Sequence, residues 1–339
     1  MTRPVATIVS EATWDAFHAR CPDATVFGSS RWLRCAARVF GGHPVYLLAP
    51  GDAAPHAKDR PGAADAHAHE AGIPLLVRHR GPFPIVTALP ITLYQGMYAS
   101  AGGFSDSAVE ALFSHIERKT FFATLPLPVG SRAGAIAESR GWERIAQRTV
   151  RIPIDTIDPT WREFSQSLRR KIRRAEDAML VCTTSDDLSI IAGMHEESYA
   201  RHGMRPPVAT TQLAAWLSML QEERLITQYV ARDGDGRARA ARVVMCDGDT
   251  VYDWMAGMGA GSVHAAASHW LVWEIMRLHA ERGMRIFDFM GANTVGVSDF
   301  KFLFGGSVVH YDVVRFRRSR AVRWLEQVKD RVTTRRRLR

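Results

Sequence analysis

The residues best suited to chemistry lie between Met284 and Gly306, where charged side chains stand among aromatic ones. Arg285 to Phe289 has the alternation of a short strand, and Asp288 lies near its end. After a stretch of small residues, Asp299 and Lys301 follow among phenylalanines. Charged groups are costly to bury unless they are paired or bind a ligand, so we do not expect this segment to be part of a purely apolar core.

A second acidic residue with aromatic neighbours is Asp253, which lies between Tyr252 and Trp254. The strand predicted here leads into three glycines between Gly257 and Gly261, and then into a long apolar helix. A glycine-rich turn before a helix can present backbone N–H groups to a phosphate. Such turns also occur without any ligand, and the sequence leaves both interpretations open.

The motifs of several large enzyme classes are absent. The chain has no GxSxG, no GxxxxGK[ST], no HExxH, no cysteine in a papain-like context and no GxGxxG between a strand and a helix. This argues against a serine or cysteine hydrolase, a P-loop ATPase, a dinucleotide enzyme and a zinc hydrolase. Direct transfer catalysis remains, in which geometry and backbone donors do most of the work.

Cysteine and histidine spacing does not predict a metal site. The four cysteines are scattered, without CxxC pairs, and are too few for a disulfide scaffold. They are Cys21, Cys35, Cys182 and Cys246. Three histidines, His56, His67 and His69, share a polar stretch, where solvated side chains are a better interpretation than metal ligands. We expect no bound metal.

Helical and strand patterns alternate along the 339 residues, and helices flank a mostly antiparallel meander, which fits an α+β fold. The length suits two domains of roughly 150 residues each. The order helix, strand, loop, short segment, strand occurs after Asp106 and again after His264. That repetition is what two tandem domains of one fold would produce.

We expect an N-terminal domain over residues 1–150 and a C-terminal domain carrying the active site over residues 151–320. Residues 50–72, rich in Ala, Asp, Pro and Gly, predict a mobile hairpin loop. Residues 321–339 predict a basic helix or tail. A single helix from Pro159 to Asp177, with one apolar stripe, is predicted to open the second domain.

The net charge of +9, from 44 basic and 35 acidic residues, favours anionic partners such as tRNA, nucleotide phosphates or a membrane surface. Much of the excess lies in RRKIRR, Arg169 to Arg174, and in Arg335 to Arg337. The first cluster either contacts phosphates or is a solvated helix face. No apolar run approaches the roughly 20 residues of a membrane span, and the N-terminus lacks a signal-peptide core, so we expect a cytoplasmic protein.

Several of these segments together resemble the Fem-type (FemABX) aminoacyltransferases, a branch of the GNAT acyltransferase superfamily. The segment from Asp288 to Gly306 resembles the family's "fDf-G" strand followed by "fK-FG". WDAF…PDATVFGSSRWL, LRRKIRRAED, YARHGMRPP and VYDWMAG resemble further family segments in the same order. The resemblance spans nearly the whole chain. It implies tandem GNAT-like domains, each a mixed, mostly antiparallel sheet flanked by helices.

The resemblance also implies roles for individual residues. Lys301 matches the lysine of "fK-FG" and would bind a phosphate or stabilise an oxyanion; a surface lysine paired with Asp299 is the alternative. Asp288 would orient or deprotonate the attacking amine, or serve as a structural hydrogen-bond acceptor. Asp253 is a second candidate base. Arg205 would hold an anionic acceptor, or is a solvated loop arginine.

Two further sets follow from the resemblance. The substrate-binding set is Arg205, Tyr252, Trp254, Asp299 and Phe304. The phosphate- or tRNA-binding set is Arg169, Arg170, Lys171, Arg173 and Arg174.

The implied function is transfer of an aminoacyl group from aminoacyl-tRNA onto an amine by direct attack, with no resident cofactor. The usual GNAT phosphate loop, Arg/Gln-x-x-Gly-x-Gly/Ala, is not evident, which together with the charge favours tRNA over acyl-CoA. The acceptor would be a peptidoglycan precursor or a natural-product amine, and it could be phosphorylated. The basic tail would allow peripheral membrane contact. One alternative is N-acylation from acyl-CoA or an acyl carrier in polysaccharide or lipid assembly; another is a non-catalytic basic RNA-binding protein.

Overall fold

The computed structural model describes residues 4–50, 71–100, 103, 105–201, 203–259 and 262–318. The predicted mobile loop, apart from its ends, and the predicted basic tail lie outside these ranges, as do Gly261 and the three loop histidines. The chain divides into two compact units. Unit 1 takes its described residues from 1–146 and from 311–339, and unit 2 is residues 147–310.

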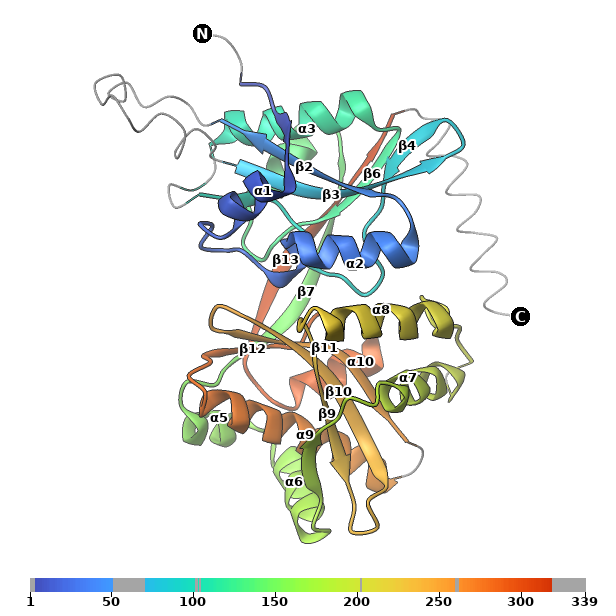
Figure 1. The fold of residues 1–339 in the computed structure, drawn as a ribbon. Helices are drawn as coiled ribbons and strands as arrows, with labels where there is room; N and C mark the ends of the chain where they lie inside the picture. The colour runs from blue at the N-terminus through green and yellow to red at the C-terminus, as the bar shows by residue number, and fades with distance from the viewer. Residues whose placement is uncertain are drawn as a thin grey trace. The chain divides into compact units, whose positions relative to one another are not determined.

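Unit 1 contains a mixed sheet in the order β1-β2-β3-β4-β6-β13, with β5 pairing β3 (Figure 1). The β4–β6 pair is parallel and the other described pairs are antiparallel. The elements are β1 (Thr7–Val9), α1 (Glu11–His18), a 3-10 helix (Val26–Gly28), α2 (Ser30–Phe40), β2 (His43–Ala49), β3 (Ala71–Arg80), β4 (Phe83–Val86), β5 (Tyr98–Ala99), α3 (Asp106–Lys119), β6 (Phe122–Pro126), α4 (Ala133–Ser139) and β13 (Ser307–Arg317).

Strand alternation separates two apolar faces in unit 1. Leu47 and Ile73 join the buried cluster that contains the apolar stripe of α3. Tyr46, which alternates with Leu47, points the other way and stacks on Trp14 of α1 at a centroid distance of 5.6 Å. Helices α3 and α2 accordingly lie on opposite faces of the sheet (Figure 1).

Unit 2 contains a second mixed sheet in the order β7-β12-β11-β10-β9-β8. The β11–β12 pair is parallel, and the other described pairs are antiparallel. The elements are β7 (Glu143–Pro153), α5 (Ile157–Glu163), α6 (Gln166–Asp177), β8 (Val181–Thr184), α7 (Ser189–Arg201), α8 (Thr210–Glu222), β9 (Thr227–Arg232), β10 (Ala238–Asp247), β11 (Thr250–Met258), α9 (Ser262–Ala280), β12 (Ile286–Asp288) and α10 (Val295–Phe302).

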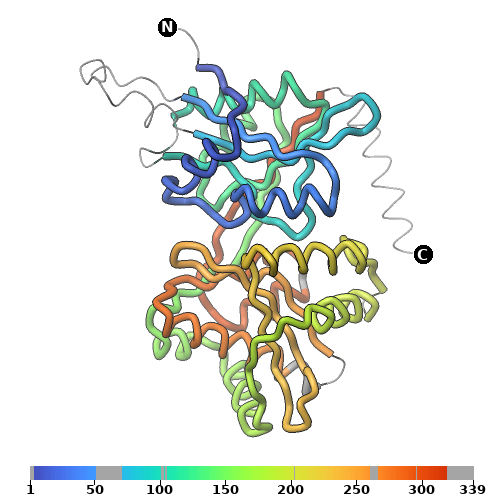
Figure 2. The backbone as a smooth tube through the Cα atoms, in the orientation of Figure 1, coloured from blue at the N-terminus to red at the C-terminus, as the bar shows by residue number. Residues whose placement is uncertain are grey.

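Helix α9 is the central element of the unit 2 core. Its side chains from Ala266 to Met276 are almost all buried, and they share one cluster with α6 and the sheet. Helix α7 packs against β10 and β11 and contacts α8. The trace in Figure 2 shows the chain entering unit 2 through β7 and leaving through β13. By residue range, each of these two strands contributes to both units.

The α+β prediction is confirmed, with differences in detail. The single helix predicted from Pro159 to Asp177 is two helices, because the chain is extended at Phe164 and the side chain of Ser165 caps α6 by accepting the backbone N–H of Leu168. The segment containing Asp299 and Lys301, for which no helix was predicted, is helix α10. Strands β1, β4 and β5 are additions to the predicted elements.

Candidate functional site

The parallel strands β11 and β12 separate inside unit 2. Their ladder ends at the pair Tyr252 with Asp288, while β11 continues to Met258. On the other side of β11, the register with β10 shifts between Val243 and Val244, which leaves Trp254 as the extra residue of a β-bulge. The edge of β11 that faces β12 is paired with that strand only from Thr250 to Tyr252. Where two neighbouring strands part, backbone donors and acceptors can pair with another extended chain.

The backbone turns sharply where β12 ends. Met290 has φ of 55° and Gly291 has φ of 86°, the left-handed region that L residues rarely adopt. The amide groups of this turn reach β7: Phe289 donates to the carbonyl of Val150 at 3.0 Å, and Ala292 donates to the carbonyl of Arg148 at 2.7 Å. The turn is thus anchored along one side by β7.

Asp288 closes the same turn with both carboxylate oxygens. Its Oδ1 accepts the Thr149 hydroxyl and the Met290 amide, each at 2.8 Å, and its Oδ2 accepts Nε of Arg151 at 2.8 Å. The hydroxyl oxygen of Thr149 accepts the Gly291 amide at 3.0 Å. With no exposed surface, Asp288 is placed as the structural acceptor of this strand end.

Lys301 approaches the turn from α10. Its ammonium donates to the carbonyl of Phe289 at 2.6 Å, to that of Met290 at 3.4 Å and, at short range, to that of Gly291. It also lies 5.9 Å from the centroid of the Phe289 ring. Lys301 is 9% exposed and has no ion pair within the described part of the chain; the predicted alternative, a surface lysine paired with Asp299, is wrong. Asp299 itself is exposed.

Burial lowers the pKa of Lys301 to about 8. The carboxylate of Asp253 raises this pKa, the guanidinium of Arg242 lowers it, and the carboxylate of Asp288 raises it by a smaller amount. These groups lie close enough to influence one another, so the three residues predicted to be catalytic, Lys301, Asp288 and Asp253, do belong to one region. A lysine with such a pKa changes charge near neutral pH.

Asp253 forms a buried ion pair with Arg242, which lies on β10. The guanidinium also donates to the Ser268 hydroxyl at 3.2 Å and lies 5.2 Å from the centroid of the Phe300 ring. Asp253 is 5% exposed and Arg242 is 3% exposed. Oδ1 of Asp253 and Nε of Arg242 are buried without a hydrogen-bond partner in the described structure, so this pair is not fully satisfied.

The other predicted substrate residues differ in their surroundings. Tyr252 and Trp254 flank Asp253 and are each 4% exposed, with Trp254 edge-on to Trp216 of α8. Phe304 is fully buried against Phe289, which makes it part of the core. Arg205 is exposed in the loop between α7 and α8.

The basic cluster lies on α6. Arg170, Arg173 and Arg174 are exposed, whereas Lys171 is half-buried. Arg169 instead donates to the carbonyl of Arg162 at 2.9 Å and to that of Trp161 at 3.4 Å. Three of the five predicted phosphate contacts are therefore exposed to solvent.

The predicted glycine turn begins later than the sequence suggested. Gly257 lies inside β11, where a Cβ atom would come within 2.6 Å of Cβ of Met194 on α7. The absence of a side chain at Gly257 allows α7 to pack closely on β11, and this glycine is not part of a turn. Gly259 follows the strand, and residues 260 and 261 lie outside the described ranges.

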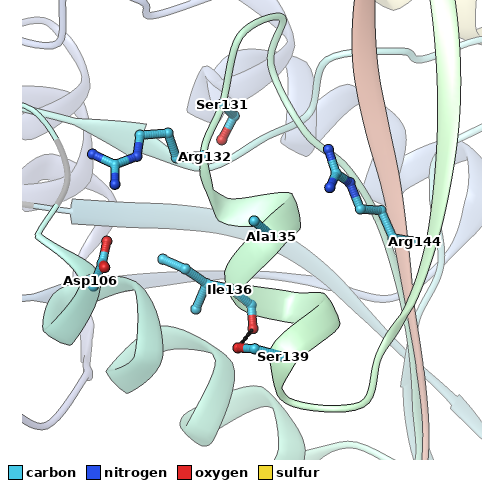
Figure 3. Close-up of a pocket in the computed structure, with 7 residues that line it drawn as sticks. All are labelled: Asp106, Ser131, Arg132, Ala135, Ile136, Ser139 and Arg144. Atoms are coloured by element: carbon cyan, nitrogen blue, oxygen red, sulfur yellow. Dashed lines mark hydrogen bonds between the residues drawn. The ribbon is translucent and has the colours of Figure 1, made fainter.

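Two surface pockets are lined by other residues than those of this charged region. One, in unit 1, has a volume of about 440 Å³ and is lined from α3, α4 and β7. Figure 3 shows Asp106 and Arg132 on one side of α4 and Arg144 on the other; Arg144 pairs with Asp312 at 3.0 Å. The second, in unit 2, has a volume of about 360 Å³ and lies near Gln228 and Arg224. Neither contains a residue of the predicted site.

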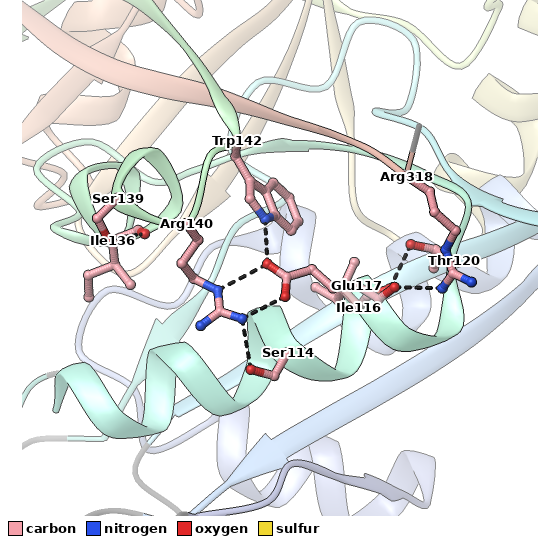
Figure 4. Close-up of polar contacts among 9 residues, drawn as sticks. All are labelled: Ser114, Ile116, Glu117, Thr120, Ile136, Ser139, Arg140, Trp142 and Arg318. Atoms are coloured by element: carbon pink, nitrogen blue, oxygen red, sulfur yellow. Dashed lines mark hydrogen bonds and ion pairs between the residues drawn. The ribbon is translucent and has the colours of Figure 1, made fainter. Parts of the chain in front are cut away.

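Unit 1 has its own polar network at the C-terminal end of α3 (Figure 4). Glu117 accepts two hydrogen bonds from Arg140, at 3.0 and 2.6 Å, and one from the indole of Trp142 at 2.8 Å. Arg318 donates to the carbonyls of Glu117 and Arg118 at 2.6 and 2.7 Å, which places a cation at the negative end of the helix dipole. The network joins helix ends and strands and is structural.

Sequence reasoning missed Arg242, Arg151 and Thr149. Arg242 had a usable signal, because it stands between Ala241 and Val243 in a predicted apolar strand. An arginine at such a position needs a partner. The roles of Arg151 and Thr149 follow only from the pairing of β7 with β12, which no local pattern reveals.

No group of three or more His, Cys, Asp and Glu side chains is arranged to hold a metal ion within the described ranges. None of the described helices is both long and apolar enough to cross a membrane.

Comparisons with known proteins identify a domain within unit 2 and a fold for the chain. The sequence profile of the acetyltransferase (GNAT) domain matches residues 162–301, a range that includes Arg242, Asp253, Asp288 and Lys301. Among curated proteins, no sequence matches the chain.

Solved structures resemble nearly the whole chain. The crystal structure of FemX superposes with a TM-score of 0.68 at 13% identity, covering 91% of this chain and 96% of FemX. L-PGS from Bacillus licheniformis gives 0.52 at 12% identity, covering 86% and 93%. A tandem GNAT protein from the clavulanic acid biosynthesis pathway gives 0.51 at 13% identity, covering 93% and 99%. The predicted Fem-type resemblance is confirmed at the level of the fold, two tandem GNAT-like units.

Proposed function

We propose that this tandem GNAT-like protein, whose second unit matches an acetyltransferase domain, transfers an aminoacyl group from an activated ester to an amine. The observation that carries the proposal is the separation of β11 and β12 at Tyr252 and Asp288, inside the matched domain and next to the buried charges. At a point where two parallel strands part, backbone hydrogen-bonding groups can pair with an extended acyl donor. The resemblance to FemX and L-PGS supports the aminoacyl class.

The reaction is a direct displacement. The nitrogen of the acceptor amine attacks the ester carbonyl, the C–N bond forms, and the tetrahedral oxyanion collapses with cleavage of the ester C–O bond. One proton leaves the amine, and one is delivered to the departing hydroxyl, so no covalent enzyme intermediate is needed. Positioned donors that stabilise the oxyanion supply the main acceleration in this class of mechanism.

The three central residues receive distinct roles. Asp288 already accepts three hydrogen bonds, so we assign it to orienting the strand end rather than to removing the proton. Asp253 retains a carboxylate oxygen without a partner in the described structure and is the better candidate base. Lys301 supplies positive charge beside the opening.

For the donor we propose aminoacyl-tRNA. The exposed arginines of α6 are suited to contacts with a phosphate backbone, and the chain carries a net charge of +9. The acceptor is an amine, either of a peptidoglycan precursor or of a natural-product intermediate. The match to an acetyltransferase domain favours acyl-CoA as the second candidate donor, with C–S rather than C–O cleavage.

The test is a two-donor assay with the full chain. Charged tRNAs are incubated with amine acceptors, and deacylated tRNA and the new amide are quantified by gel and mass spectrometry. In parallel, acyl-CoA is supplied and the released thiol is titrated. We expect amide formation that is sensitive to RNase, without thiol release.

The opposite results are equally informative. Thiol release with amide formation would transfer the assignment to an acyl-CoA-dependent N-acyltransferase. Salt-sensitive RNA binding without turnover of either donor would indicate the non-catalytic RNA-binding alternative. Replacement of Arg170 and Arg173 by Gln should weaken tRNA use while leaving the melting temperature unchanged, because both side chains are exposed.

A further inference from the structure

We propose that Lys301 is a positioning residue whose ammonium holds the end of β12 in place, so that β11 and β12 stay separated. The family resemblance suggested direct contact with a phosphate or an oxyanion, whereas the geometry points to the protein backbone as the partner of this lysine. The catalytic consequence rests on the proposed function. The structural role does not, and it can be tested without any substrate.

The carbonyl side of the turn explains why such a residue is needed. Phe289 is fully buried and Met290 is 8% exposed, so their carbonyl groups have little access to water. A buried carbonyl without a donor loses the free energy of a hydrogen bond. Lys301 brings one ammonium, with three N–H bonds, to three consecutive carbonyls.

The amide side of the turn is held independently. Its donors go to Asp288, Thr149 and the backbone of β7. The turn is therefore fastened on one face by β7 and on the other by α10, with Lys301 as the link to α10. Because Met290 adopts a left-handed conformation, the surrounding contacts must stabilise a backbone state that it would not adopt alone.

The consequence for the strand opening follows from the ladder. Asp288 forms the last β11–β12 pair, and the residues held by Lys301 come directly after it. If these residues relax, β12 can extend its pairing along β11 and close the edge that a donor would occupy. Lys301 would then affect transfer through the backbone, without touching the reacting atoms.

The charge on Lys301 should also depend on pH. It faces Asp253 on β11, Arg242 on β10 and Asp288 on β12, and burial lowers its pKa to about 8. Above that pH the neutral amine keeps two N–H bonds for three carbonyls, so one carbonyl loses its donor. The hold on the turn should therefore weaken between pH 7 and 9.

The experiment compares Lys301→Met, Lys301→Gln and, as a matched control, Lys119→Met, an exposed lysine on α3. Amide hydrogen exchange of the peptide covering residues 286–292 is measured without substrates, and kcat and KM are measured with the donor that supports turnover. In Lys301→Met we expect exchange at 289–292 to be faster by about tenfold or more. We expect kcat to fall by a similar factor with little change in KM, and Lys119→Met to match the wild type.

The other combinations of exchange and turnover also test the proposal. Lost turnover with unchanged exchange in Lys301→Met would overturn it and restore direct substrate contact. Unchanged exchange and unchanged turnover would remove any role for Lys301. If the Met variant does not fold, Lys301→Gln and the wild type are compared instead, with amide exchange corrected for its intrinsic pH dependence. If exchange at residues 289–292 of the wild type is not faster above pH 8 than below it, the proposal is contradicted. A wild type inactive with every donor rejects the proposed function but leaves the exchange test valid.

Discussion

The two units share an architecture but place their charged groups differently. Within the described residues, unit 2 buries Arg242, Asp253, Asp288 and Lys301, each at most 9% exposed, whereas unit 1 buries only Asp312 to that extent. The ionic contacts of unit 1, such as Glu117 with Arg140, lie near the surface, with about a quarter of each side chain exposed. Buried charges reduce stability and are often retained where function needs them, so the difference supports the proposal that unit 2 carries the reaction.

The same comparison shows that the larger of the two surface pockets and the buried charges lie in different units. The pocket of about 440 Å³ lies in unit 1, beside Arg132 and Arg144, far in the sequence from the buried charges of unit 2. That pocket contains none of the four buried charged residues of unit 2. The opening between β11 and β12 is instead recognised by where hydrogen-bonded pairing stops.

The largest effect should come from breaking the buried pair of unit 2. Arg242→Met leaves the carboxylate of Asp253 buried without its cation, and we expect the free energy of unfolding to fall by about 3–5 kcal/mol. Arg242→Met combined with Asp253→Leu should recover more than half of that loss. Urea denaturation of the single and double variants measures both quantities.

The control for this prediction lies in unit 1. Arg140→Met removes an ion pair of similar length that is partly exposed, so we expect a loss of only about 1 kcal/mol. Equal losses in the two variants would contradict the contrast between the units.

Acid should destabilise both units through buried histidines. Burial lowers the pKa of His279 in unit 2 to about 4, as it does for His18 in unit 1. Above pH 6.5 these rings are neutral whether the chain is folded or not. Between pH 6.5 and 4 only the unfolded chain gains protons, so stability falls with pH, by about 2–3 kcal/mol for His279 at pH 4.5.

His279→Gln should remove most of that pH-dependent loss, as measured by denaturation at pH 7 and pH 4.5. The ring lies 3.1 Å from the hydroxyl of Tyr229, a contact that Gln can replace in part. If the variant and the wild type lose the same stability on acidification, His279 is already protonated in the folded protein.

A smaller loss of stability should follow from adding a side chain where a helix packs closely on a strand glycine, an arrangement found in both units. In unit 2, Gly257→Ala places a methyl group 2.6 Å from Cβ of Met194, and we expect a loss of about 1–3 kcal/mol. In unit 1, Gly72 is crowded in the same way by Trp14 and Phe17. Thermal unfolding of the variant measures the change.

Gly193→Ala is the matched control, since Gly193 lies on the same helix α7 with nothing within 4 Å of an added Cβ. There the substitution should stabilise the protein by about 0.5–1 kcal/mol, because alanine is the better helix former. If both Gly257→Ala and Gly193→Ala lower the stability, the loss at Gly257 cannot be assigned to crowding by α7.

The sequence predicted the fold class and most elements because periodicity is local information. The long apolar helix predicted after the three glycines corresponds to α9. The break between α5 and α6 was invisible because the apolar stripe from Trp161 to Leu168 continues across it. Gly257 was assigned to a turn because its crowding by α7 is a tertiary contact.

The site was predictable in part. Charged residues in apolar company gave Asp253, Asp288 and Lys301, and the structure places them in one region. The partners of Asp288 were not predictable, because they come from β7, which is distant in sequence. The partner of Asp253 lies on the neighbouring strand β10, and its identity depends on the register of that pair. Sequence patterns identified which side chains were unusual, and only strand order assigned their partners.

The division of the chain has a consequence for how the protein is made. Strand β6 of unit 1 pairs with residues 313–317 of β13, near the end of the chain, whereas unit 2 is one continuous stretch. During synthesis, unit 2 can complete its fold as soon as residue 310 has left the ribosome. Unit 1, although translated first, has an open sheet edge until its last strand emerges, so a truncated product would expose that edge to aggregation.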